Sequence, residues 1–192
     1  MALTKREMDG MMSTGDGEWC TPKNRFRQWD SVFHFAVDVG ASKKNTLCST
    51  YIGKKENALA PKTHWCKARG PAFCNPPYGF NIIHWVAKAA AESKHSKEAI
   101  VMLLPARTET EWFQRYVFGA AQLICFLDTR VKFENPKLNG KTSQPAFPSV
   151  LAVYYREPVA GTKHFNSIYF YETALKQFGC VVNMDPHQHC DA

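Results

Sequence analysis

The chain has 192 residues, of which 45% are hydrophobic and 21% are charged, so it is long enough for one domain with a full core and has an ordinary globular composition. Its formal net charge of +7 favours a polyanionic partner, although many basic proteins bind no nucleic acid. It contains no apolar run of roughly eighteen residues and its first residues are polar, so we expect no membrane span and a cytoplasmic location.

The seven cysteines are odd in number and lie mostly in apolar segments, as Cys74 and Cys125 do. This usage is typical of reduced core thiols and not of a disulfide framework. Four residues of metal-binding type lie near the C-terminus: Cys180, His187, His189 and Cys190. Their spacing matches no standard zinc finger, so we expect no metal site.

The N-terminal third predicts a flexible lead-in, a helix and a strand. Residues 1–17 lack apolar periodicity and are expected to be flexible. Thr21 and Pro22 predict a helix start, with Thr21 as N-cap and Pro22 at the first helical position. Residues 34–39 predict an apolar strand, and a short apolar piece follows near residues 51–52.

The most informative segment combines four residue types: Asn75, Pro76, Pro77 and Tyr78, called the NPPY segment below. An apolar run before it, at residues 71–74, predicts a strand end, and residues 80–90 predict a helix. The segment would therefore lie at the carboxyl end of a strand, where open α/β sheets bind ligands. An Asn-Pro-Pro run can also be an ordinary turn, and the strand-loop-helix context favours the functional interpretation.

The NPPY residue types suit methylation of a planar nitrogen. The lone pair of an exocyclic amino group is delocalised into its ring, and acceptors that hold both amino hydrogens localise it. The Asn75 side-chain oxygen and the Pro76 carbonyl can each accept one of these hydrogens. The two prolines fix the loop in an extended shape, and Tyr78 offers a stacking face worth on the order of 1–3 kcal/mol per base.

Further along the chain, apolar runs alternate with periodic segments. The expected strands are residues 98–105, 123–127, 131–133, 149–155 and 168–171, and the expected helices are residues 110–117 and 173–178. A polar loop rich in Asn, Pro, Lys, Gly and Ser occupies residues 134–148. This alternation predicts a doubly wound α/β fold, with a mostly parallel sheet and helices on both faces.

The end of the first strand supplies a candidate cofactor site. Asp38 can accept a hydrogen bond from a cationic amino group, and the small residues Gly40, Ala41 and Ser42 let the backbone approach a ligand. No glycine-rich G-x-G-x-x-G motif is present, and a strand followed by Asp and Gly is as often a plain turn.

Several spaced motifs in one order extend this pattern. They are WCTP at 19–22, VDVGAS at 37–42 with Asn45, NAL at 57–59 with Trp65, CNPPYG at 74–79, LPART at 104–108, RVKF at 130–133 and AFPS at 146–149. Together they resemble the phage-type DNA N-6-adenine-methyltransferase (Dam) family over roughly residues 19–155.

That resemblance implies a Rossmann-like class I methyltransferase with a seven-stranded sheet and S-adenosylmethionine as donor. By the same likeness the NPPY segment is the catalytic loop, with Asn75 also at the cofactor. The cofactor-binding residues it implies are Thr21, Pro22, Asp38, Ala41, Ser42, Asn57 and Leu59. The chain departs from the family pattern at two positions: Asn57 stands where an acidic residue is expected, and Gly40 where a small alanine or cysteine is usual.

The implied function is site-specific methylation of the N6 amino group of an adenine flipped out of double-stranded DNA, with GATC as the expected target, in a bacterial or phage-infected cell. Basic residues that could contact the DNA are Arg107, Arg130, Lys132, Lys137 and Lys141, although a solvated basic loop is the plain alternative. The catalytic domain is expected at residues 18–157 and a C-terminal extension at 158–192, and the oligomeric state is open.

Other functions remain open on the residues alone. The same tetrapeptide serves methylation of cytosine N4 in DNA, guanine in RNA or glutamine in proteins, although those enzymes usually carry a glycine-rich first motif. A non-catalytic DNA-binding module that keeps the fold is a further alternative, against which the intact NPPY segment argues.

Overall fold

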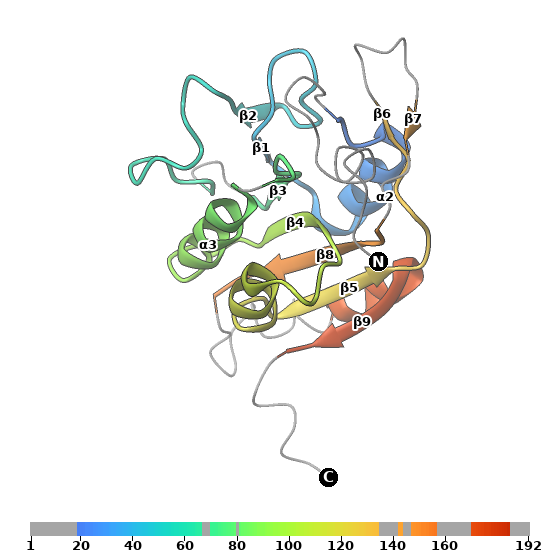
Figure 1. The fold of residues 1–192 in the computed structure, drawn as a ribbon. Coiled ribbons are helices and arrows are strands. Elements are labelled where there is room, and N and C mark those ends of the chain that lie inside the picture. The colour runs from blue at the N-terminus through green and yellow to red at the C-terminus, as the bar shows by residue number, and fades with distance from the viewer. Residues whose placement is uncertain are drawn as a thin grey trace, which may run out of the picture.

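A computed structural model describes residues 19–66, 70–79, 81–134, 142–143, 147–156 and 170–184, with residues 142–143 described by their backbone alone. Within these residues seven strands form one sheet in the order β2-β1-β3-β4-β8-β5-β9 (Figure 1). The strands in this order are Thr50–Ile52, Val37–Val39, Ala72–Cys74, Ile100–Pro105, Ser149–Tyr154, Leu123–Leu127 and Gly179–Asn183. A separate two-stranded ladder pairs β6 (Phe133–Glu134) with β7 (Thr142–Ser143).

The sheet is mixed: β2, β1, β3, β4 and β5 run in one direction, as a mostly parallel sheet requires, and β8 and β9 run in the opposite direction. Strands β2, β1, β3 and β4 pair in parallel, whereas β8 is antiparallel to β4 and β5, and β9 is antiparallel to β5. Strand β8 lies between β4 and β5 and runs in the opposite direction to both, so these two strands have an antiparallel neighbour on that side. Strand β4, expected at residues 98–105, is central and fully buried, and it is parallel to β3 on one side and antiparallel to β8 on the other.

Helices cover both faces of the sheet. On one face, α3 (Ile82–Ser93) and the π-helical turn η1 (Phe113–Phe118) pack against one buried cluster. On the other face, α2 (Lys23–Phe33), a helical stretch at residues 170–175 and the 3-10 turn η3 (Lys176–Phe178) pack against a second cluster. A mixed α/β fold with a seven-stranded sheet therefore positions the site.

Helix α2 begins one residue later than expected. Its first residue is Lys23 and its N-cap is Pro22, not Thr21. Pro22 has φ −60° and ψ 133°, so it is extended, and its carbonyl accepts the amide hydrogen of Phe26 at 3.0 Å. Thr21 is buried, with 5% exposure, and precedes the helix instead of capping it.

The strand expected at residues 34–39 is shorter, because α2 ends at its start. His34 is the C-cap of α2 in the left-handed region (φ 55°), and its amide donates to the Asp30 carbonyl. The Phe35 amide donates to Asp30 Oδ1 at 2.7 Å. Strand β1 therefore starts at Val37.

The C-terminal part differs most from expectation. Residues 170 and 171 were expected in a strand and are helical, and the strand β9 was not expected at all. Tyr171, Ala174, Leu175 and Phe178 lie at a helical spacing, and all four pack against the α2-side cluster. The expected helix at 173–178 is confirmed, with a 3-10 end, and residues 168–169 lie outside the described residues.

Two further expectations concern sequence composition. Cys74 and Cys125 are free and fully buried as expected, but Cys20, Cys48, Cys66 and Cys180 are partly or fully exposed because they lie in loops or on the edge strand β9. None of the helices that the structure describes is both long and apolar enough to cross a bilayer.

Candidate active site

The NPPY segment follows β3 at the carboxyl edge of the parallel half of the sheet. Val39, the last residue of β1, is the register partner of Cys74, the last residue of β3. Gly40 and Asn75 therefore leave neighbouring strands side by side. The loops after β1 and β2 project from the same edge, at the top of Figure 1. The structure thus places the segment where the sequence predicted it.

Asn75 is oriented by the N-terminal segment. Its amide nitrogen Nδ2 donates to the Trp19 carbonyl at 3.5 Å, and the side chain is half-buried. Nδ2 and Oδ1 point in different directions on a planar amide. When Nδ2 faces the Trp19 carbonyl, Oδ1 therefore faces away from Trp19 and can accept a hydrogen bond from another group. Pro76 is buried and Pro77 is exposed, so the segment is fixed on one side and open on the other.

Tyr78 lies in an aromatic cluster that the sequence did not reveal. Its ring centroid is 6.0 Å from that of Phe133, edge-on, and 6.2 Å from that of Phe147, tilted by 53°. Its hydroxyl donates to the Leu103 carbonyl at 3.4 Å, and burial raises its pKa. Phe133 and Phe147 lie far from Tyr78 in sequence. Phe133 was expected in a strand and Phe147 in the loop at residues 134–148, so nothing in the sequence linked them to Tyr78.

Asp38 is the buried acidic residue of this edge. It is 5% exposed on β1, and the Leu47 amide donates to its Oδ2 at 2.9 Å. Burial raises its pKa from 3.8 to about 6, and the bond from Leu47 offsets part of this rise. A carboxylate desolvated in this way gains most from a cation placed beside it.

The loop after β1 is held together by Asn45. Asn45 Oδ1 accepts hydrogen bonds from the Ser42 amide and the Ser42 hydroxyl, both at 2.7 Å. Its Nδ2 contacts Cys20 Sγ at 3.7 Å. Together with the Asn75–Trp19 bond, this brings the predicted cofactor residues Thr21, Pro22, Asp38, Ala41 and Ser42 close to the NPPY segment.

The conformation of Gly40 explains why this chain has glycine where the family usually has alanine or cysteine. It has φ +85°, a conformation that favours glycine, and a Cβ there would lie 3.2 Å from the Trp85 ring on α3. At Gly53, a Cβ would lie 3.1 Å from the Ala41 carbonyl oxygen. The loops after β1 and β2 therefore touch. This contact connects the predicted cofactor residues after β1, such as Ala41, with the loop after β2 that carries Asn57 and Leu59.

Asn57 and Leu59 lie on the loop after β2, farther out. Asn57 is exposed with φ 50°, and its Oδ1 accepts the Leu59 amide at 3.3 Å. The described contacts do not bring either residue against Asp38 or Asn75. A cavity of about 500 Å³ borders this loop, and its lining includes none of the predicted site residues.

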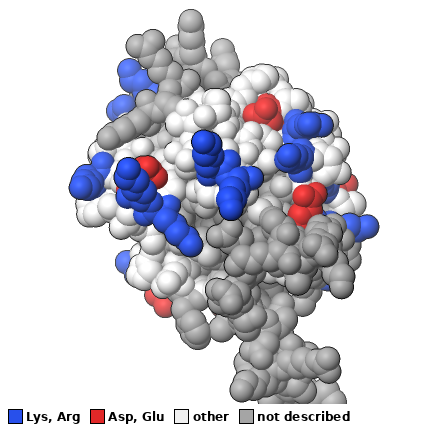
Figure 2. All heavy atoms as spheres, turned by 90° about the horizontal axis from the view of Figure 1, so that it is seen from above, with Lys and Arg blue, Asp and Glu red and all other residues white. Residues whose placement is uncertain are grey.

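The basic residues predicted to contact DNA fare differently from one another. Arg107 is paired with Glu109, Nε to Oε1 at 3.1 Å. Arg130 and Lys132 are exposed between β5 and β6, whereas Lys137 and Lys141 lie outside the described residues. Figure 2 looks onto the upper face of Figure 1 and shows Lys and Arg spread widely over it, with fewer Asp and Glu.

Among the residues that the structure describes, no group of three or more His, Cys, Asp or Glu could hold a metal ion. Cys180 is exposed on β9, and the other three residues of the C-terminal Cys/His group lie outside those residues.

A seven-stranded mixed sheet with an NPPY segment at its carboxyl edge fits the methyltransferase-like class of α/β proteins. A family model for DNA N-6-adenine-methyltransferase (Dam) matches residues 11–177. The chain therefore belongs to the DNA N-6-adenine-methyltransferase (Dam) family, as its motifs predicted.

Two curated relatives carry the same family name. The DNA N-6-adenine-methyltransferase of Haemophilus phage HP1 is 27% identical over 165 residues, which is 84% of this chain and 90% of the relative. The DNA N-6-adenine-methyltransferase of Escherichia phage T1 is 32% identical over 107 residues, which is 55% of this chain and 43% of the relative.

Proposed function

We propose that this protein transfers a methyl group from S-adenosylmethionine to the N6 amino group of an adenine flipped out of double-stranded DNA. The observation that carries the proposal is the geometry of Asn75. Its amide nitrogen is engaged by Trp19 at 3.5 Å, which leaves its Oδ1 as an acceptor at the carboxyl end of β3. Family membership supports adenine as the target base.

The chemistry assigned to the NPPY segment needs two acceptors and a stacking face. Asn75 Oδ1 and the Pro76 carbonyl each accept one amino hydrogen, which localises the nitrogen lone pair as it attacks the methyl carbon. The nitrogen–carbon bond forms as the donor's sulfur–carbon bond breaks, and the methylated amine then loses a proton. Tyr78 stacks on the base, and Phe147 and Phe133 fix the angle of its ring.

The residues around Asp38 fit a cationic methyl donor. S-adenosylmethionine supplies an activated methyl group on a sulfonium and carries an amino group of positive charge. Asp38 holds that amino group, and Ala41 and Ser42 hold the rest of the methionine part. Thr21 and Pro22 border the donor, whereas Asn57 and Leu59 line its adenine. The raised pKa of the buried Asp38 supports this assignment, because a bound cation offsets the cost of ionising it.

The finer description of the fold belongs to the same proposal. We assign the domain to the Rossmann-like class I methyltransferases with a doubly wound sheet. Helices on both faces and four consecutive parallel strands support this assignment.

The recognition sequence we propose is GATC, which is the sequence expected from the family resemblance. The proposed phosphate contacts are Arg107, Arg130, Lys132, Lys137 and Lys141. For Arg107 such a contact requires exchange of its partner Glu109 for a phosphate. Exposure of this ion pair makes the exchange inexpensive.

A label-transfer assay tests the substrate class. Purified protein is incubated with methyl-labelled S-adenosylmethionine and, separately, with unmethylated duplex DNA, RNA and a protein mixture. We expect label in DNA. Label in protein or RNA alone would refute the proposal, and cofactor binding that calorimetry fails to detect in folded protein would favour a non-catalytic DNA-binding module.

A further inference from the structure

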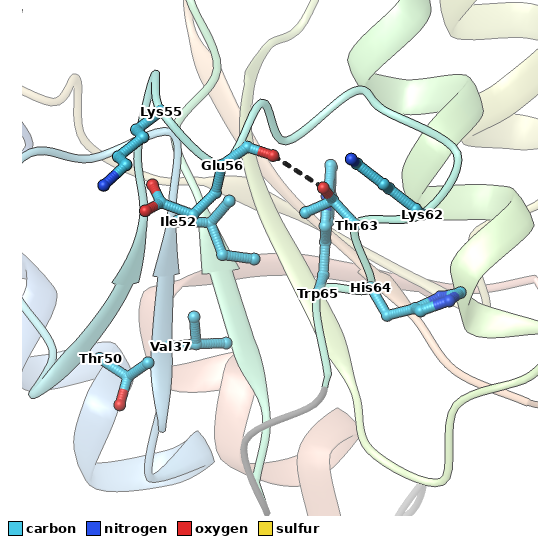
Figure 3. A pocket seen from close by; sticks show the side chains of 9 residues that line it. All are labelled: Val37, Thr50, Ile52, Lys55, Glu56, Lys62, Thr63, His64 and Trp65. Atoms are coloured by element: carbon cyan, nitrogen blue, oxygen red, sulfur yellow. Dashed lines mark hydrogen bonds between the residues drawn. The ribbon is translucent and has the colours of Figure 1, made fainter.

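The loop after β2 forms one wall of a cavity that the proposed methyl-transfer chemistry does not use. The cavity has a volume of about 500 Å³, within the usual range for ligand sites. Its lining residues are Val37, Thr50, Ile52, Lys55, Glu56, Lys62, Thr63, His64 and Trp65. Figure 3 shows Lys55 on one side and Lys62 on the other, with Glu56 and Thr63 between them.

The wall of this cavity is fixed in place. Glu92 on α3 accepts the Trp65 backbone amide at 3.3 Å and pairs with His64 at 3.3 Å and Lys88 at 2.7 Å. The indole nitrogen of Trp65 donates to the Ala58 carbonyl at 2.9 Å. The loop is therefore built against the sheet and α3, and the cavity is present before any ligand binds.

The lining combines an apolar floor with a positive rim. Val37, Ile52 and Trp65 are buried in the floor, and Lys55 and Lys62 are exposed at the rim. Glu56 is the one acidic lining residue, and its Oε2 accepts the Gly53 amide at 2.9 Å. This arrangement suits a ligand with a negative charge and some apolar surface, as a sugar-phosphate chain has.

The surrounding surface extends the positive charge. Residues 40–66, which comprise β2 and the loops that flank it, contain five lysines, at positions 43, 44, 54, 55 and 62, and one acidic residue, Glu56. All five lysines are exposed. Such an excess of positive charge over negative charge in one segment favours binding of a polyanion.

The cavity also lies at a suitable distance from the NPPY segment. Strand β2 is two strand spacings from β3, so the ends of these strands, from which the two loops leave, are roughly 10 Å apart across the sheet. That separation corresponds to about three base steps of duplex DNA at roughly 3.4 Å each. A duplex whose base enters the NPPY site would therefore extend over this lobe.

We propose that the β2 lobe (residues 53–65) is a second contact surface for the DNA backbone, in which Lys55 and Lys62 bind phosphates near the target base. This inference rests on the proposed function, since it presumes a DNA substrate. It adds a phosphate-binding surface distinct from Arg107, which follows β4, and from the basic residues between β5 and β8.

The salt dependence of DNA binding tests it. The test variant is Lys55→Gln/Lys62→Gln, and the control is Lys94→Gln/Lys97→Gln, which removes the same charge just before β4, at the opposite edge of the sheet. Dissociation constants for a short duplex are measured by fluorescence anisotropy between roughly 50 and 200 mM salt, because each phosphate contact contributes close to 0.9 to the log–log slope.

We expect the test variant to lose about two contacts, so that its slope falls by roughly 1.8 and its affinity near 0.1 M salt falls roughly 10- to 100-fold. The control should match the wild type. An unchanged slope in the test variant, or equal losses in both variants, would overturn the inference.

Cofactor binding separates the remaining possibilities. S-adenosylhomocysteine affinity, measured by calorimetry, should be the same in the test variant and the wild type. Loss of that affinity with an unchanged DNA slope would assign the cavity to the cofactor and overturn the inference. If the wild type binds DNA and methylates it while the lobe variant keeps its slope, the inference alone fails. A wild type that neither binds nor methylates DNA refutes the proposed function itself.

Discussion

At the residue scale, the site depends on side chains that are oriented by partners distant in sequence. Asn75 is turned by Trp19, and Tyr78 is packed by Phe133 and Phe147, whereas Asp38 accepts a hydrogen bond from the amide of Leu47, which is nine positions away. The NPPY residues themselves could be predicted from sequence, because their chemistry resides in residue type and order. Their partners could not, because nothing local marks a residue that contacts another across more than fifty positions.

Loss of the Asn75 acceptor should abolish most activity. Asn75→Ala removes Oδ1 while the neighbouring prolines keep the loop fixed, so we expect kcat to fall by about 100- to 1000-fold, as for loss of one preorganised transition-state partner. Single-turnover methylation kinetics measure the change, and thermal unfolding serves as the control for the fold. Near-normal turnover would refute the role assigned to Asn75.

The Tyr78 ring, and not its hydroxyl, should carry its function. Tyr78→Ala removes a stacking face worth about 1–3 kcal/mol, so kcat/KM should fall roughly 5- to 150-fold. Tyr78→Phe keeps the ring and loses one hydroxyl bond of 3.4 Å, so it should stay near the wild-type value. If the Phe variant fared as badly as the Ala variant, stacking would be the wrong explanation.

Asp38 should lower the stability of the cofactor-free protein at neutral pH. Its folded-state pKa of about 6 lies above the ordinary 3.8, so the stability that its protonated form contributes is lost as the pH rises through 6. Asp38→Asn removes this cost, and we expect it to raise the unfolding free energy at pH 8 by up to about 3 kcal/mol.

Urea denaturation of both proteins at pH 5 and pH 8 measures this difference. The gain from Asp38→Asn should be roughly half as large at pH 5 as at pH 8, because the cost of ionising Asp38 develops between pH 3.8 and about 6. A variant that is less stable than the wild type at pH 8 would show that the carboxylate already has a stabilising partner. The variant should also lose affinity for S-adenosylmethionine, because the cation then lacks its counter-charge.

At the element scale, the sequence predicted the central elements better than the peripheral ones. Continuous apolar runs gave β4, β5 and β8 because burial on both faces leaves an unbroken apolar segment. Strand β9 was not predicted because it has no continuous apolar run: its five residues alternate between half-buried and exposed. Residues 170–178 have helical spacing, but their aromatic side chains also suit a strand.

The directions of the strands in the antiparallel half of the sheet could not be predicted from the sequence either. Strand direction depends on where β8 enters between β4 and β5, and its apolar run is the same in either direction. The first strand was placed three residues too early because His34, Phe35 and Ala36 are apolar or aromatic. Their backbone instead caps α2 and bonds to Pro71.

The close packing of β9 on β5 gives a prediction about Gly179. A Cβ at this position would lie 1.9 Å from the Phe126 carbonyl oxygen, and its φ is +156°. Gly179→Ala must push the two strands apart, so we expect a loss of unfolding free energy of roughly 1–3 kcal/mol.

Val182→Ala on the same strand is the matched control. Val182 is 38% exposed, so its truncation should change stability by no more than about 0.5 kcal/mol. Chemical denaturation of both variants measures the difference. Equal stability of the two would show that β9 does not pack on β5 as described.

At the scale of the whole molecule, one sheet connects the site with the rest of the chain. The NPPY segment, the Asp38 region and the basic β2 lobe share the carboxyl edge of the parallel half. The antiparallel half carries the C-terminal elements, which bury Leu175 and Phe178 against the α2 side. The proposed chemistry thus lies on one half of the sheet, and the other half completes the core.

The central claim is that the protein methylates adenine N6 in DNA through the NPPY segment. The most direct test incubates the wild type and Asn75→Ala with unmethylated duplex DNA and S-adenosylmethionine, then digests the DNA and identifies the modified nucleosides by mass spectrometry. We predict N6-methyladenine with the wild type and almost none with the variant. N4-methylcytosine in place of N6-methyladenine, or equal N6-methyladenine with both proteins, would contradict the claim.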